Sequence, residues 1–126
     1  MYIFSFDGEA AGSAVFSTIT AAQKLSGAGV AQIAGTDISG TSEVYQPNRG
    51  AYKGLPVRAL LISAETAAVN FTFDGTTPTV AAGTNIGHQL AAGASYVVSG
   101  QNNVRNFQCI NSVAANGAIV KASMLV

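Results

Sequence analysis

Apolar and polar residues alternate most regularly over residues 68–73, which read AVNFTF. The apolar positions are Val69, Phe71 and Phe73, with Asn70 and Thr72 between them. Successive side chains of a β-strand point to opposite faces, so this pattern predicts a strand with one face on a core and the other in water. The Asp74-Gly75 pair that follows predicts a tight turn, because glycine accepts a positive φ and aspartate bonds its own downstream backbone.

Two longer apolar runs predict further strands. Residues 55–64, LPVRALLISA, carry apolar side chains at both parities, as expected of a strand buried on both faces, and Pro56 fits only at its start. In residues 118–126, AIVKASMLV, one face is wholly apolar: Val120, Ala122, Met124 and Val126. The other face mixes a lysine and a serine with larger apolar residues, which indicates partial cover by another subunit.

Shorter segments continue the pattern. HQL (residues 88–90), SYVVS (residues 95–99) and VRNFQCI (residues 104–110) predict strands, with turn signals at residues 92–93, 100–103 and 116–117. Short strands separated by turns about every eight to twelve residues are typical of a sandwich or barrel rather than a parallel α/β sheet. We therefore expect an all-β single domain, an antiparallel β-sandwich or barrel-like (jelly-roll-like) fold with an extended N-terminal segment.

The beginning of the chain is less clearly patterned. Residues 1–6, MYIFSF, predict a short strand or an arm that pairs with a neighbouring chain, because aromatic and β-branched residues favour extended structure. Residues 13–25 fit either a short helix closed by Gly27 or a strand followed by a turn. We favour a strand over residues 15–20 and a helix over residues 20–25, followed by loops with one short strand near residues 30–33.

Composition changes near residues 45–54, YQPNRGAYKG. We therefore divide the chain into residues 1–54, an N-terminal arm with an irregular or mixed segment of the same domain, and residues 55–126, the β-sandwich core. Arg49, Lys53 and Arg58 form a small basic cluster around this boundary. A solvated linker is the favoured interpretation, and a salt-bridging contact to an acidic neighbour is the alternative.

Charge is scarce along the whole chain. Only 10% of the 126 residues are charged, six basic and six acidic, compared with about a quarter in typical soluble domains. Long-range attraction to nucleic acid or to an anionic membrane surface is therefore not expected. Low net charge also favours association, so we expect assembly, with a monomer of under-charged surface as the alternative.

The sequence gives no sign of a membrane span or an export signal. Its longest apolar stretches fall short of the about 20 residues that cross a bilayer. Asp7 and Glu9 interrupt the region where the apolar part of a secretory signal would run. Cys109 is the single cysteine, so no internal disulfide forms, and the chain is compatible with a reducing cytosol.

Candidate catalytic residues are few. His88 is the single histidine, and with no second imidazole to share a metal it is expected to be a hydrogen-bonded loop or strand-start residue. Cys109 lies in an alternating segment, where a buried thiol behaves as a small hydrophobe rather than a nucleophile. The six carboxylates stand singly, without the pairing of a glycosidase or the loop spacing of a calcium site. We expect no enzyme activity, no cofactor and no metal.

An ordered series of motifs runs through residues 55–126: VRALLIS, FDGTTPT, GHQLAAG, SYVVSG, VRNFQCI and a final strand. In this series the chain resembles a group of small virion structural proteins of tailed bacteriophages. The resemblance implies a short all-β protein without catalytic residues, used as a capsid decoration (cement) protein or as a head or tail accessory part. Residues 1–54 are not covered by it.

A capsid decoration protein is the leading expectation from this resemblance. It would assemble in the host cytoplasm into the virion, bind the major capsid protein or other virion proteins, and stabilise the shell as a homo-oligomer, with a trimer expected. The run from Thr76 to Thr79 would present a neutral surface edge stiffened by its proline. The residues expected at protein contacts are Tyr2, Phe4, Phe6, Arg49, Tyr52, Lys53, Thr76, Thr77 and Pro78.

A recognition module is the alternative. In that case the chain would be a tail or neck accessory part that binds a host-surface glycan or another tail protein. Such a module needs exposed aromatic side chains, and the candidates are Tyr45, Tyr52 and Tyr96.

Overall fold

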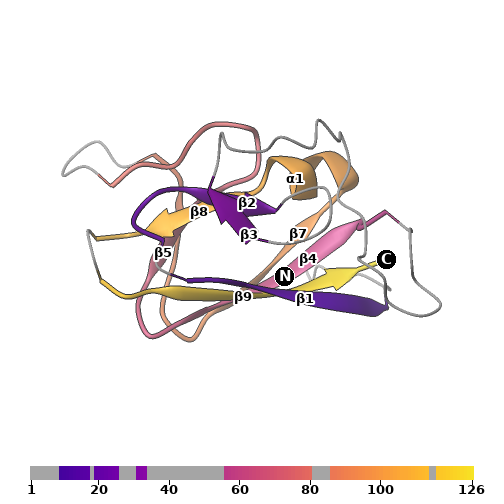
Figure 1. Cartoon of the computed structure of the whole chain (residues 1–126), viewed down its shortest axis with the longest axis horizontal. Helices are drawn as coiled ribbons and strands as arrows, with labels where there is room; N and C mark the ends of the chain where they lie inside the picture. Colours follow the sequence, from indigo (N-terminus) through magenta and orange to yellow (C-terminus); the bar gives the residue numbers. More distant parts are fainter. Residues whose placement is uncertain (1–8, 18, 26–30, 34–55, 81–85, 114–115) are drawn as a thin grey trace, which may run out of the picture.

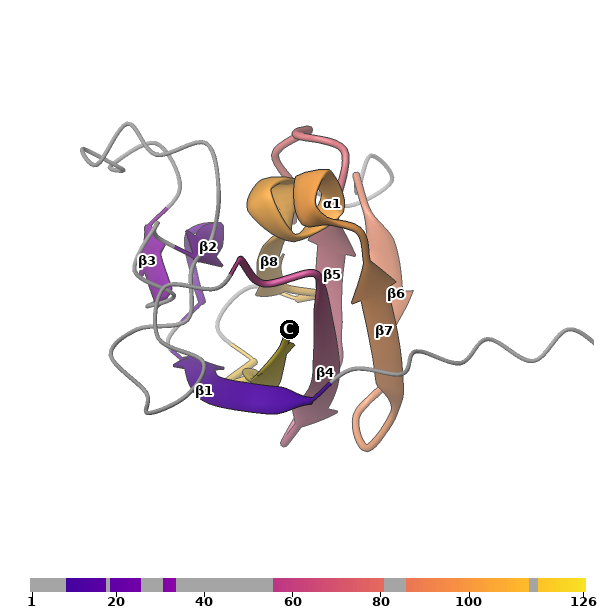
Figure 2. The same cartoon turned by 90° about the vertical axis from the view of Figure 1, so that its right-hand side faces the viewer.

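The computed structural model describes residues 9–17, 19–25, 31–33, 56–80, 86–113 and 116–126. Within these ranges the chain forms two antiparallel β-sheets that face each other, with one short helix, α1 (Gln101–Asn106), at one end of the two layers (Figures 1 and 2). The expectation of an all-β, sandwich-like single domain is confirmed. The described part of the chain contains no helix that is long and apolar enough to cross a membrane.

The four-stranded sheet has β4 and β9 at its centre. Its strands, in spatial order, are β1 (Ala10–Phe16), β9 (Ile119–Leu125), β4 (Ala59–Glu65) and β7 (Ser95–Ser99). Residues aligned across the sheet share a face, so Ile62 lies between Ala122 on one side and Tyr96 on the other. Among the described strands, β7 pairs with β4 alone and is therefore an edge strand.

The five-stranded sheet forms the second layer. Its spatial order is β3 (Ala31–Ile33), β2 (Gln23–Leu25), β8 (Gln108–Asn111), β5 (Val69–Thr72) and β6 (His88–Leu90). The short strand expected near residues 30–33 is confirmed as β3. Since β1, β2 and β3 all precede residue 34, the early part of the chain supplies strands to both layers. The division of the chain after residue 54 stays a prediction, because residues 34–55 lie outside the described ranges.

The core fills the space between the two sheets. Its largest fully buried side chains are Phe16, Ile19, Leu25, Leu60, Ile62, Phe107 and Met124. The rings of Phe16 and Phe107 meet edge to face with centroids 5.7 Å apart, one of the arrangements that aromatic pairs prefer. Full burial of one such side chain contributes about 1.5–3 kcal/mol, so the packed core holds the two layers together.

The burial predicted for β5 is wrong. Its polar residues Asn70 and Thr72 are buried, just as its apolar residues are. The side-chain amide of Asn70 donates to the carbonyl of Thr79 at 3.3 Å, and the hydroxyl of Thr72 donates to the carbonyl of Thr76. The loop after β5 therefore folds back over the outer face of its own strand and excludes water from it.

The opposite error applies to β4, which was expected to be buried on both faces. Leu60, Ile62 and Ala64 are fully buried, but Leu61 on the other face is 43% exposed. Val15, on the same outer face of the sheet, is 52% exposed. On the outer face of the four-stranded sheet, then, Leu61 and Val15 are exposed, whereas Ala59 at the start of β4 is buried.

Two local predictions are also wrong. The helix expected over residues 20–25 is replaced by β2, because Gln23 and Lys24 pair with β3 on one side and β8 on the other. The strand expected over residues 104–110 begins only at Gln108, because α1 precedes it. One helical turn places Val104 and Phe107, three residues apart, on the same buried side, which an extended chain would not do.

Candidate functional site

Residue types that commonly act in catalysis are not clustered in the described part of the chain. No group of three or more His, Cys, Asp or Glu side chains there is placed to hold a metal ion. His88 begins β6 and is exposed, in agreement with its prediction as a strand-start residue. Cys109 is fully buried in β8, and burial raises the pKa of its thiol, which keeps it protonated. Its prediction as a buried hydrophobe is confirmed.

The open edge of β7 is the first feature of a candidate site. The N–H of Gly100 donates to the carbonyl of Arg58 at 2.7 Å, and the N–H of Ala64 donates to the carbonyl of Ala94 at 3.0 Å. These bonds set the alternation of the antiparallel ladder, so the even-numbered residues of β7 direct their backbone groups towards β4. The odd-numbered residues, Ser95, Val97 and Ser99, direct theirs away from the sheet.

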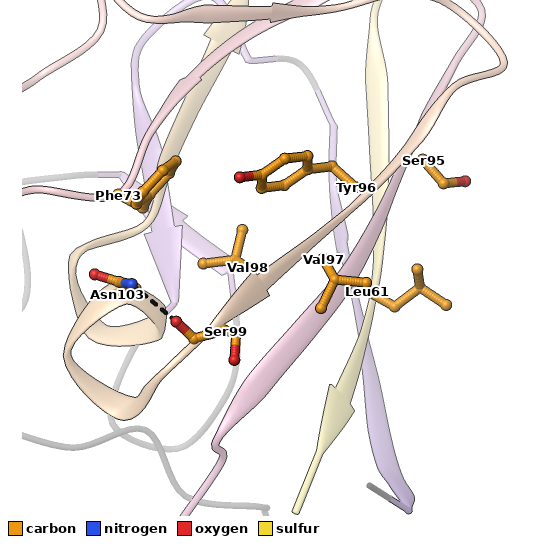
Figure 3. A pocket seen from close by; sticks show the side chains of 8 residues that line it. All are labelled: Leu61, Phe73, Ser95, Tyr96, Val97, Val98, Ser99 and Asn103. Carbon is orange, nitrogen blue, oxygen red and sulfur yellow. Dashed lines mark hydrogen bonds between the residues drawn. The ribbon is translucent and has the colours of Figure 1, made fainter. Parts of the chain in front are cut away.

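A cavity of about 550 Å³ lies along this edge. Its lining comes from both faces of β7 and from its neighbours: Leu61, Phe73, Ser95, Tyr96, Val97, Val98, Ser99 and Asn103. Figure 3 shows Tyr96 and Val98 on the side of Phe73, whereas Val97 and Leu61 lie on the other side of the strand. The side-chain amide of Asn103 donates to the carbonyl of Ser99 at 2.8 Å and closes one end (Figure 3). The cavity is therefore a groove that follows the backbone of β7.

The inner wall of this groove is aromatic. The rings of Phe73 and Tyr96 stack with centroids 6.3 Å apart at 25°, and Phe73 also stacks on His88 at 5.7 Å and 19°. Phe71, 3% exposed, lies beneath them, with its ring 5.3 Å from that of Tyr96. Tyr96 itself is 41% exposed. Apolar or aromatic side chains that enter the groove would meet a wall of aromatic rings.

The outer face of the four-stranded sheet adjoins the same edge. Two of its rows, read across the strands, are Val15, Lys121, Ser63 and Ser95, and Ser13, Ser123, Leu61 and Val97. Lys121 and Glu65 form an exposed ion pair with Nζ and Oε2 3.2 Å apart. The mixed character predicted for this side of β9 is confirmed; its cover by another subunit stays a prediction. We call this surface the serine-valine face.

The structure describes only some of the predicted contact residues. Tyr2, Phe4, Phe6, Arg49, Tyr52 and Lys53 lie outside the described residues, as does Tyr45. Thr76 and Thr77 are exposed, as the predicted surface edge requires. Pro78 is buried, so its prediction as a surface residue is wrong. The hydrogen bonds from Asn70 and Thr72 hold this loop against the sheet and turn the proline inward.

Leu61, Val97 and Val15 were not among the predicted contact residues. Their apolar character indicated burial, but in the structure Leu61 and Val15 are exposed and Val97 is half-buried. One signal could have pointed to them: apolar residues at both parities of a strand, in a chain with so few charges, also fit an exposed face that is covered on assembly.

No known protein family, curated protein or solved structure matches this chain. The described site is therefore interpreted from its own geometry, which is that of an all-β sandwich with an open strand edge and a charge-poor sheet face.

Proposed function

We propose that this chain is a non-enzymatic virion structural protein of a tailed bacteriophage, a capsid decoration protein that binds the assembled shell and stabilises it as a homo-oligomer. The serine-valine face is the observation that carries the proposal, together with the motif series of residues 55–126. It is a sheet surface with one ion pair, short side chains and exposed Val15 and Leu61.

Such a face suits a repeated protein contact. Serine, alanine and valine side chains lose little rotamer entropy when they are covered, unlike long charged side chains. The Lys121–Glu65 pair carries no net charge, so the contact does not have to bury an uncompensated one. A protein that binds only the assembled shell shifts the assembly equilibrium towards it, which is how decoration stabilises a capsid.

The experiment is a count of this chain in purified virus particles by quantitative mass spectrometry against the major shell protein. Hundreds of copies per particle would support shell decoration. A dozen or fewer would move the protein to the neck or tail, and a particle without this chain would overturn the virion proposal.

A surface variant tests the face itself. Val15→Lys places a charge on the serine-valine face at an exposed position, and we expect it to lower particle occupancy while stability changes by no more than about 0.5 kcal/mol. Val113→Lys is the matched control, because Val113 is 63% exposed and follows β8 in the other sheet. Equal occupancy of the two variants would exclude the serine-valine face as the shell contact.

A recognition module is the second candidate, and the groove favours it. Tyr96 is exposed beside Phe73 in a cavity of about 550 Å³, and aromatic rings of this kind stack on sugars. Glycan-array binding that disappears in Tyr96→Ala would support this function. An array without binding, combined with high copy number, would leave decoration as the function.

A further inference from the structure

The edge of β7 is built to accept another strand. Ser95 and Val97 direct their N–H and C=O groups away from β4, and in the described structure no other strand pairs with them. The carbonyl of Ser99, at the end of the strand, already accepts the side-chain amide of Asn103. Native sheets usually shield such edges with charges, prolines or bulges. The segment SYVVS contains no charged residue and no proline, and β7 pairs with β4 in unbroken register. Over Ser95 to Val98 its edge is therefore both unprotected and regular.

We infer that this edge receives residues 1–6 of a neighbouring copy as an added strand. The inference rests on the homo-oligomer of the proposed function and names the contact that builds it. Addition of a strand to an open edge takes its affinity from main-chain hydrogen bonds and its specificity from pockets for alternate side chains.

The sequence of residues 1–6 fits the two sides of the groove. In an extended MYIFSF, Tyr2, Phe4 and Phe6 share one face, and Met1, Ile3 and Ser5 share the other. Of the two registers possible for a strand paired with β7, the one that we infer places the aromatic set on the side of Tyr96 and Phe73, where the wall is aromatic. The remaining set would lie on the side of Leu61 and Val97.

Residues 1–6 cannot form a complete added strand on the β7 edge of their own chain. Glu9 is bonded to Val126 in both directions, at 3.0 and 3.3 Å, so it is fixed beside β9 in line with β1. An added strand beyond β7 would lie four strand spacings from β1, or about 19 Å. The three steps from Glu9 to Phe6 span about 11 Å at most. Phe6 therefore cannot reach this edge within its own chain, and a strand that includes all of residues 1–6 needs a second copy as its donor.

The resulting contact is head to tail. Two copies can exchange residues 1–6 reciprocally as a closed pair. Where each copy instead donates to one neighbour and accepts from another, the assembly closes into a larger ring if the rotation permits, and otherwise grows as a filament. A ring of three satisfies the expectation of a trimer, whereas a symmetric pairing of β7 with β7 would give only dimers.

Val97→Pro in the full-length chain tests the edge directly. It removes an N–H that points away from β4, so the ladder within the sheet stays intact while the added strand loses a donor. We expect the oligomer seen by light scattering after size exclusion to dissociate about tenfold or more readily than the wild type. Val97→Ile, which keeps the N–H, is the matched control, and the melting curve of each variant verifies folding. An unchanged oligomer mass for Val97→Pro, or a monomeric wild type, overturns the inference.

Disulfide trapping provides an independent measurement. Ile3→Cys mixed with Val97→Cys, each in the 126-residue chain, should give a crosslinked dimer on non-reducing gels, because the proposed pairing puts both positions on the same face of the extended sheet. Ile3→Cys mixed with Val15→Cys, on the opposite edge strand, should not, and Cys109 is too buried to interfere. A crosslink of equal yield in both mixtures, or in neither, overturns strand addition at β7.

The two proposals fail separately. Particles that carry many copies of the wild type while Val97→Pro retains its oligomer would overturn strand addition and leave decoration in place. A trapped dimer from a protein that never enters particles would overturn decoration and leave strand addition in place.

Discussion

The ring of Phe71 on β5 packs against the ring of Tyr96 on β7, with centroids 5.3 Å apart and planes at 47°. The two strands belong to different sheets, so this contact joins the layers at the side where the edge groove lies. Phe71 also contacts the rings of Phe73, His88 and Phe107. One side chain therefore links the core to the wall of the candidate site.

Phe71→Ala should be among the most destabilising substitutions in the chain. Phe71 is 3% exposed, and its removal leaves a cavity at the junction of the sheets, so we expect the free energy of unfolding to fall by about 3–5 kcal/mol. Tyr96→Ala should lower the free energy of unfolding by less, because Tyr96 is 41% exposed and water fills the space that its ring leaves. Urea unfolding of both variants measures the difference, and a larger loss for Tyr96→Ala would contradict this ranking.

Gly87 precedes β6 in a backbone conformation that side chains rarely adopt. Its φ is +123°, and a Cβ there would lie 3.0 Å from the carbonyl oxygen of Phe71. Gly87→Ala therefore adds a clash with backbone to the conformational strain, and we expect a loss of about 2 kcal/mol or more.

Gly93→Ala is the matched control for Gly87→Ala. Gly93 has a φ of +83°, but a Cβ there meets nothing within 4 Å, so only the cost of the left-handed conformation remains, about 1 kcal/mol. Thermal unfolding of the two variants separates the cost of the clash with backbone from the cost of the left-handed conformation. Equal losses would mean that the strand adjusts to the added methyl group.

Several strands could be predicted from the sequence. Ser95–Ser99 and Ile119–Leu125 match the predicted segments within one or two residues, because each is a run rich in apolar residues that follows a glycine or asparagine turn. The same reasoning failed where the structure of a segment depends on pairing with strands from elsewhere in the chain. Gln23–Leu25 has good helix formers and becomes a strand only because β3 and β8 flank it.

The candidate site was less predictable than the fold. Tyr96 was considered as an exposed aromatic residue, but the groove also needs Leu61, Val97 and Phe73, which belong to three segments of the chain. Their proximity depends on the strand order, and the open edge depends on which residues of β7 bond to β4. Neither property is encoded in a local pattern. Pro78 shows the converse, since hydrogen bonds from another segment bury a residue typical of exposed turns.

Asp74 gives the fold a pH-dependent contribution. Its carboxylate accepts a hydrogen bond from the N–H of Thr76 at 3.0 Å, and this bond, followed by one from the Thr76 hydroxyl, lowers the pKa of Asp74 below 3.8. The folded pKa is lower than the unfolded one, so the contribution is complete above pH 3.8 and is lost as the pH falls below it.

Asp74→Asn isolates that contribution, because asparagine keeps an acceptor for the turn but carries no charge. We expect the stability difference between the wild type and the variant to shrink as the pH is lowered from about 5 to about 2. Melting temperatures across this range measure it, and NMR titration of the carboxyl group gives its pKa. A constant difference across the range would show that the charge of Asp74 does not contribute.

Cys109 should report on unfolding of the whole sandwich. It is fully buried in β8, and burial raises the pKa of its thiol. In the native protein a reagent therefore cannot reach the sulfur, and the reactive thiolate does not form at neutral pH. We expect reaction with a disulfide reagent at neutral pH to be slower than in denaturant by about a thousandfold or more, since opening must precede it. Val113→Cys, exposed on the surface, is the positive control within the same chain.

The raised pKa of Cys109 also determines whether the stability of the fold rises or falls at alkaline pH. The thiol is protonated in the folded state, whereas the unfolded chain releases this proton above its ordinary pKa of 9.0. Stability is therefore fully present below pH 9.0 and falls as the pH rises past it. In Cys109→Ala this loss should disappear, so the stability of the wild type relative to the variant should decrease between about pH 8 and pH 10. A relative stability that stays flat, or rapid labelling of Cys109 in the native protein, would contradict a closed core around β8.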